Sequence, residues 1–252
     1  MENVGFIDGI SALDCSRLTI QNCLFKDIFS SSIELNGVNE FTIINNVVEY
    51  SEGYIGREDT NYGILISYNS DPVNPPNIIS SNGLIQNFKG SNYKPSANYQ
   101  DILVSGSENI NMTSFNCPQG MVLSRYGEKP NSIPCSKISI LGSSIGSLLI
   151  LSVTNVLIDL SNCGFLVVAD YRFDIFPREI FLRNSTFSDI SMFGCQDLQI
   201  ENSNFTNISN ERSSFYCLNN RKGLDLYYEG FPFEGTVIFT LPSVNSPNAP
   251  GI

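Results

Sequence analysis

Histidine is absent from this chain of 252 residues. Its absence removes the side chain that most often serves as a general base or completes a catalytic triad. It also excludes zinc sites that mix cysteine with histidine, and the 7 cysteines include no Cys-x-x-Cys pair. We therefore predict no cofactor. Calcium remains an option only if carboxylates gather somewhere on the surface.

Basic charge and long apolar runs are scarce as well. The 14 Lys and Arg against 25 Asp and Glu give a net charge of −11. An acidic chain gains nothing from phosphate backbones or anionic lipids, so neither nucleic-acid binding nor membrane insertion is expected. The most apolar stretch, Ile145–Leu160, is interrupted by polar residues. No signal peptide is visible at Met1–Asp8, which has no basic region followed by an apolar one.

What the chain does have is a short motif that recurs along its length. The clearest copies are Leu18–Ile28, Ile180–Ile190 and Leu198–Ile208. Each reads apolar, x, apolar, x, Asn, small, x, Phe, x, Asp or Asn, Ile. Weaker copies begin at residues 41, 78, 110, 138 and 158. Spacings of about 20 residues between compact copies are typical of a solenoid.

Each position of the motif has a physical interpretation. The alternation at its start predicts a strand with one buried face. The Asn suits a left-handed corner, and stacked copies can join amide to amide as a ladder. The Phe is expected to point into the core after the corner. The predicted ladder and core residues are Asn22, Asn45, Asn82, Asn162, Asn184, Asn202, Phe25, Phe165, Phe187 and Phe205.

This repeat resembles that of the right-handed parallel β-helix proteins of the pectate-lyase-like superfamily, over residues 13–208 or so. The resemblance implies an all-β fold, a single-stranded right-handed parallel β-helix (β-solenoid) of about nine coils. A leucine-rich repeat is the nearest alternative, but its leucine spacing and helical halves are missing. We expect the β-helix to span 1–210, with terminal strands or a cap at 211–241 and an extended tail at 242–252.

The resemblance is specific for architecture and unspecific for activity. Polygalacturonases of this fold use a histidine, and pectin methylesterases use an arginine motif that contains tryptophan. The chain has neither His nor Trp. No catalytic residue of those enzymes can therefore be transferred to it.

Two groups of residues are candidates for a site. Loops interrupt the repeats between 51 and 77 and again at 90–99, and loops on one side of a solenoid often bind ligands. The ligand-binding candidates that they bring are Tyr54, Arg57, Tyr62, Tyr93 and Tyr99.

The second group is a row of alternating charges. Asp170, Arg172 and Asp174 would share one face of a strand, and Arg178 follows them. Two carboxylates beside an arginine suit calcium and a uronate, with arginine as the base of a lyase-like reaction. A row of exposed ion pairs explains the same residues without any chemistry.

Cys117 and Cys135 flank the Pro- and Gly-containing segment Pro118–Pro134, which makes them the candidates for a disulfide. We expect a non-enzymatic structural or adhesive β-solenoid of a virion, extracellular filament or cell surface, assembling with other protein chains through coil ends or sides. A carbohydrate-active β-helix (lyase-like or depolymerase) or carbohydrate-binding β-helix, with polysaccharide as partner, is the alternative. A cell-surface recognition module that does not assemble is a third possibility.

Overall fold

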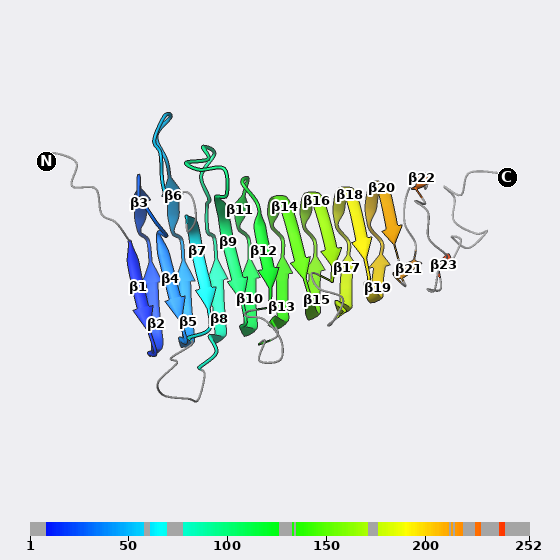
Figure 1. The fold of residues 1–252 in the computed structure, drawn as a ribbon, viewed down its shortest axis with the longest axis horizontal. Coiled ribbons are helices and arrows are strands. Elements are labelled where there is room, and N and C mark those ends of the chain that lie inside the picture. The colour runs from blue at the N-terminus through cyan, green and yellow to red at the C-terminus, as the bar shows by residue number, and fades with distance from the viewer. Residues whose placement is uncertain are drawn as a thin grey trace, which may run out of the picture.

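The chain is a rod of stacked coils in the computed structural model (Figure 1). The structure describes residues 9–57, 61–69, 78–125, 133, 135–170, 176–211, 213, 215–218, 225–227 and 237–239. Within these ranges the regular elements are all strands. The tail expected at 242–252 lies outside the described residues, and so does most of the terminal region expected at 211–241.

Two long parallel sheets run along the rod. Sheet A is 11-stranded, with β11 (Asn116–Cys117) beside β14. In spatial order its other strands are β1 (Ile10–Leu13), β4 (Ile33–Asn36), β7 (Tyr62–Ser67), β9 (Gln100–Ser105), β12 (Met121–Ser124), β14 (Ser144–Leu151), β16 (Asn162–Ala169), β18 (Thr186–Phe193), β20 (Asn204–Glu211) and β22 (Asp225–Tyr227).

Sheet B is 10-stranded and faces sheet A across the core. Its strands are β2 (Ser16–Gln21), β5 (Asn39–Ile44), β8 (Ser81–Gln86), β10 (Glu108–Thr113), β13 (Cys135–Leu141), β15 (Val153–Asp159), β17 (Arg178–Arg183), β19 (Gln196–Glu201), β21 (Phe215–Leu218) and β23 (Val237–Phe239). A two-stranded sheet joins β3 (Leu24–Lys26) to β6 (Val47–Glu49).

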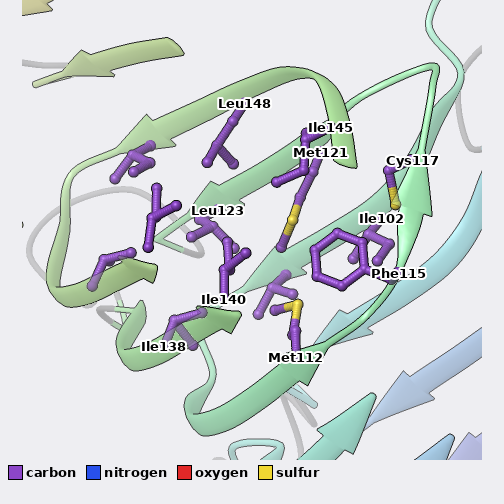
Figure 2. Packing of buried hydrophobic residues seen from close by; sticks show 14 of the residues in the cluster. Ile102, Met112, Phe115, Cys117, Met121, Leu123, Ile138, Ile140, Ile145 and Leu148 are labelled. Carbon is purple, nitrogen blue, oxygen red and sulfur yellow. The ribbon is translucent and has the colours of Figure 1, made fainter. Parts of the chain in front are cut away.

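Each strand pairs in parallel with its equivalent one coil further on. Ile110 lies opposite Ile138, which in turn lies opposite Val156. Inward residues therefore stack into continuous apolar rows, and Figure 2 shows such rows meeting between the sheets, with Met112 and Leu123 among them. This is the right-handed parallel β-helix that the repeat predicts, with ten strands in sheet B where about nine coils were expected.

The core phenylalanines of the motif are placed as expected in three copies. Phe25, Phe187 and Phe205 are all buried. The prediction for Phe165 is wrong, because its side chain is 43% exposed. Cys163 lies in register with Phe187 and takes the inward place. This copy of the motif begins two residues earlier than the sequence suggested, since Val156 is the partner of Ile180.

That shift also displaces one of the predicted ladder residues. Asn22, Asn45, Asn184 and Asn202 have φ values of 56°, 54°, 46° and 48° and form left-handed corners after sheet B. In the shifted copy the left-handed corner is Leu160, with φ 50°. Asn162 is instead the first residue of β16, so its assignment to the corner row is wrong.

Asn82 belongs to a different row of corners, near the start of the sheet B strands. Its φ is 55°, and its Nδ2 donates to Asn39 Oδ1 at 2.8 Å. An amide ladder does follow the first row of corners: Asn45 Nδ2 donates to Asn22 Oδ1 at 3.1 Å, and Asn87 Nδ2 donates to Asn45 Oδ1 at 3.0 Å. The ladder is on the surface and ends where Ser114 replaces asparagine at the next corner.

A buried serine ladder explains the small residue that follows the corner. Ser143, Ser161, Ser185 and Ser203 are buried one above the next. The N–H of each of the first three donates to the next serine's Oγ at 3.1–3.2 Å. Each hydroxyl also donates to a carbonyl of its own coil, as Ser161 Oγ does to Asp159 O at 2.9 Å. The ladder therefore satisfies polar groups that the corner would otherwise leave buried and unpaired.

Replacing Ser185 with alanine should lower the free energy of unfolding by about 1–3 kcal/mol, because the buried N–H of Ser161 loses its acceptor. Urea unfolding followed by circular dichroism measures the change. The control is Ser139→Ala on the outer face, where the hydroxyl donates to the exposed Asn111. Equal losses of unfolding free energy in the two variants would show that the buried serine contributes no more to stability than an exposed one.

The disulfide predicted between Cys117 and Cys135 is not present, because both cysteines are free and buried. Cys117 is paired with Ile145 in sheet A, whereas Cys135 is paired with Val153 in sheet B. The two thiols therefore belong to different sheets of the solenoid. Both act as small core residues.

Candidate ligand-binding site

The loops that follow β6 and precede β9 meet over one corner of the rod and are joined there by tyrosines. The ring of Tyr50 stacks on Tyr54 at 5.7 Å between centroids and meets Tyr99 edge-on at 5.3 Å. Tyr99 is 0% exposed. The expectation that Tyr99 binds a ligand is therefore wrong, since its ring is part of the core beneath the loops.

A buried carboxylate lies under this tyrosine cluster. Asp101 on β9 is 0% exposed and accepts hydrogen bonds from the Tyr99 hydroxyl at 3.0 Å, the Ser91 N–H at 3.1 Å and the Gln119 N–H at 2.7 Å. Gly90 leaves the necessary room, because a Cβ there would stand 2.3 Å from the Asp101 carboxyl. Asp101 thus ties two loops to the scaffold.

Sequence inspection missed Asp101, although a signal was available. Asp101 directly precedes the apolar strand segment Ile102–Val104. A carboxylate buried next to such a segment is costly unless hydrogen bonds compensate its charge. Only the folded chain shows which donors supply those hydrogen bonds.

Burial shifts the acidities in this cluster. It raises the pKa of Asp101 to about 7, although the hydrogen bonds from Gln119, Tyr99 and Ser91 oppose the shift. Burial likewise raises the pKa of Tyr99 and, with smaller electrostatic contributions, that of Tyr50. Both phenols therefore stay neutral near pH 7 and serve in packing and hydrogen bonding.

Further hydrogen bonds hold the first loop in place. Tyr50 donates its hydroxyl to Asn61 Oδ1 at 3.0 Å, and Asn61 Nδ2 donates to Phe29 O at 3.3 Å. Ser51 donates both its N–H and its hydroxyl to the Asp27 carboxylate, at 2.7 and 2.8 Å. The loop is thereby anchored to the segment between β3 and β4 of the preceding coil before any ligand binds.

A surface hollow of about 450 Å³ opens beside these loops. Two tyrosines, Tyr50 and Tyr93, line it together with charged and polar groups. Those groups are Glu49, Glu52, Lys89, Ser91 and Asn92. An apolar ring among carboxylates, an ammonium group and an amide is a set suited to a hydroxyl-rich ligand.

The remaining loop candidates are scattered around this hollow. Tyr54 reaches it indirectly, through its stacking on Tyr50. Arg57 is exposed further along the loop, where its N–H donates to Phe29 O at 2.7 Å. Tyr62 is half-buried at the start of β7. Among the predicted ligand-binding residues, Tyr93 is the one that lines the hollow directly.

Of the charged row predicted around residue 170, the structure describes only Asp170 and Arg178, so the row as a whole stays a prediction. Asp170 follows β16 and is only 4% exposed, and Ser152 Oγ donates to its Oδ1 at 3.2 Å. Arg178 is exposed at the start of β17, in the other sheet. Arg172 and Asp174 lie outside the described residues.

Neither a metal site nor a membrane span is found in the part of the chain that the structure describes. Its His, Cys, Asp and Glu residues form no group of three or more that could hold a metal ion. The same part contains no helix with the length and apolar character needed to cross a bilayer.

The parallel strand order and register define the class of this protein as a right-handed parallel β-helix with a loop-bordered hollow on one side. No family model and no curated protein matches the sequence. A solved structure that resembles the chain is that of the surface protein and adhesin PfbA of Streptococcus pneumoniae, with 12% identity over 89% of this chain and 67% of that one, at a TM-score of 0.42. The fold rests on this chain's own topology, and a likeness of that size adds no functional argument.

Proposed function

We propose that this chain is a non-enzymatic, adhesive β-solenoid displayed on a cell surface, extracellular filament or virion. Its contact surface is the hollow lined by Tyr93. The observation that supports this proposal is the rigid attachment of the loops around the hollow. Its walls are loops fixed from below by Asp101 and by the tyrosine cluster. A recognition surface held this way loses little conformational entropy when it binds.

The chemistry of the hollow favours a glycan as the ligand. The Tyr93 ring offers a flat apolar face for the C–H face of a sugar ring. Glu49 and Glu52 accept hydrogen bonds from hydroxyls, and Lys89 donates them. The rod then serves as a spacer that carries this surface away from its attachment.

A carbohydrate-active enzyme is the second candidate, and one observation favours it. Glu49 and Glu52 line the same hollow, and glycoside hydrolysis needs a pair of carboxylates on either side of the scissile bond. Release of reducing sugars or of unsaturated products from a bound glycan, abolished in Glu49→Gln, would establish this function in place of adhesion.

The adhesive function is tested by binding the chain to a panel of immobilised polysaccharides and glycans. Tyr93→Ala should weaken the observed binding about 30-fold or more, which is the loss expected of an aromatic contact residue worth about 2 kcal/mol. Phe176→Ala is the matched control, because Phe176 is 41% exposed outside the hollow. Binding that is unaffected by Tyr93→Ala, or absent across the panel, would contradict the proposed site.

A further inference from the structure

The outer face of sheet A carries a row of aliphatic side chains that the proposed function does not use. Neighbouring strands place them in register, each opposite the next. All are half-buried and point away from the core. The aliphatic stripe consists of Leu65, Leu103, Val122, Leu149 and Val167.

At the stripe, the strands of sheet A carry an apolar residue on the outer face as well as on the inner one, whereas the next outward row of β7, β9 and β12 is Ser67, Ser105 and Ser124. In β7, Leu65 stands between the buried Ile64 and Ile66, and in β12, Val122 stands between the buried Met121 and Leu123. Near-continuous apolar runs are typical of parallel strands that are covered on both sides. The middle of sheet A therefore has the composition of a sheet with a second layer on its outer face.

Sheet B shows that the stripe is not a general property of this rod. The equivalent outward row there is dominated by polar residues, which alternate with the buried apolar ones. That row runs Thr19, Thr42, Leu84, Asn111, Ser139, Leu157, Phe181 and Gln199. A solvent-facing parallel sheet of this protein is thus mostly polar, and the centre of sheet A departs from that pattern.

Charge is also missing from the stripe. Strands β7, β12, β14 and β16 contain no charged residue, and the one on β9 is the buried Asp101. In a chain whose net charge is −11, this leaves a neutral apolar face on an acidic rod. Such a face suits a partner of the same character better than a basic one.

The order of residues along the stripe identifies that partner. Extended by one strand at each end, the outward row is Glu34, Leu65, Leu103, Val122, Leu149, Val167 and Ser191. A two-fold axis through Val122, parallel to the strands, brings Leu103 opposite Leu149 and Leu65 opposite Val167 of a second copy. Glu34 then meets Ser191 and not another carboxylate. The row is therefore complementary to itself, as an isologous interface requires.

We infer that two copies of this chain pack face to face through the outer face of sheet A, with their long axes antiparallel and Val122 on the two-fold axis. The inference adds a partner for lateral assembly to the proposed adhesive role. The dimer itself does not depend on that role, but its biological purpose does. Stacked sheets lie about 10 Å apart, so the side chains of the two stripes would interdigitate.

The expected dimer is a weak one. Strands about 4.8 Å apart and about 13 Å long, from β1 to β20, offer on the order of 550 Å² per copy. The total of about 1,100 Å² is at the lower end for specific interfaces. Because both copies are acidic, added salt should strengthen the association by screening their repulsion.

Sedimentation equilibrium of the purified chain at 10–200 µM, in low and high salt, tests the inference. We expect a monomer–dimer equilibrium that Val122→Glu abolishes, since it places two carboxylates at the axis. The matched control is Leu157→Glu, an equally half-buried outward residue of sheet B, which should leave the dimer intact. Circular dichroism melting checks that both variants are folded.

A charge swap tests the register. Leu103→Lys and Leu149→Glu should each weaken the dimer at least tenfold, and the double variant should recover it, because the two positions face each other only across the axis. A monomeric wild-type chain, or a dimer that Val122→Glu and Leu157→Glu affect equally, would overturn the inference. Glycan binding by a chain that stays monomeric would support the adhesive function and contradict the dimer.

Discussion

Replacing Gly83 with alanine is expected to destabilise the rod by about 3 kcal/mol, at the upper end of the usual cost of overpacking a core. A Cβ at this position on β8 would lie 2.0–2.6 Å from three atoms of the Phe41 ring. Phe41 is 1% exposed, on the neighbouring strand β5, so its ring has no free space to enter. Chemical denaturation of the two proteins measures the difference.

Two further variants make this prediction specific. Phe41→Leu removes the atoms in conflict, so it should recover part of the stability of Gly83→Ala, although it leaves a cavity in the wild-type background. Gly142→Asn is the control. A Cβ added at Gly142 would meet no atom within 4 Å, and Gly142 has a φ of +59° at the corner position that asparagine occupies in other coils. A loss from Gly142→Asn as large as that from Gly83→Ala would refute the packing explanation.

Stability should also depend on pH through Asp101. Its pKa of about 7 in the folded chain lies above the ordinary aspartate value of about 3.9. The folded state therefore binds an additional proton between these values. The resulting stabilisation is complete below about pH 4 and is lost as the pH rises to about 7, at about 1.4 kcal/mol per unit and up to about 4 kcal/mol in all.

The comparison with Asp101→Asn isolates this effect from that of the many other carboxylates. Asparagine cannot titrate, and its amide group leaves one of the N–H donors of Ser91 and Gln119 without an acceptor. The variant should be less stable at pH 5 and show a flatter stability profile between pH 5 and 7. Parallel profiles for the two proteins would mean that Asp101 does not titrate in this range.

The wrong predictions for Asn162 and Phe165 share one cause, which is register. The motif placed Phe165 in the core because Phe stands at the matching distance from Asn162. The strand pairing shows Leu160 at the corner and Cys163 inward. A shift by two residues keeps the alternation of apolar and polar residues, so hydrophobic pattern alone cannot detect it. Only the pairing of β16 with its neighbours decides between the two alignments.

The site shows a different limit. Tyr54, Tyr93 and Tyr99 were grouped correctly as loop tyrosines, but the sequence carries no information on which ring faces outward. Tyr99 became a core residue because its hydroxyl meets a carboxylate two residues away, across the turn into β9. The hollow itself is formed by residues from β6 and from the segment before β9, which are distant in the chain and adjacent in the stack.

The sequence by itself determined the fold class of this protein, because a repeat of strand, left-handed corner and core residue can bury its apolar face only by stacking on its own copies. Tertiary structure decided everything that depends on neighbours across coils: the serine ladder, the buried Asp101, the hollow beside Tyr93 and the aliphatic stripe of sheet A. Each of these joins residues from several coils, and the insertions of unequal length between coils hide their alignment until the strands are paired.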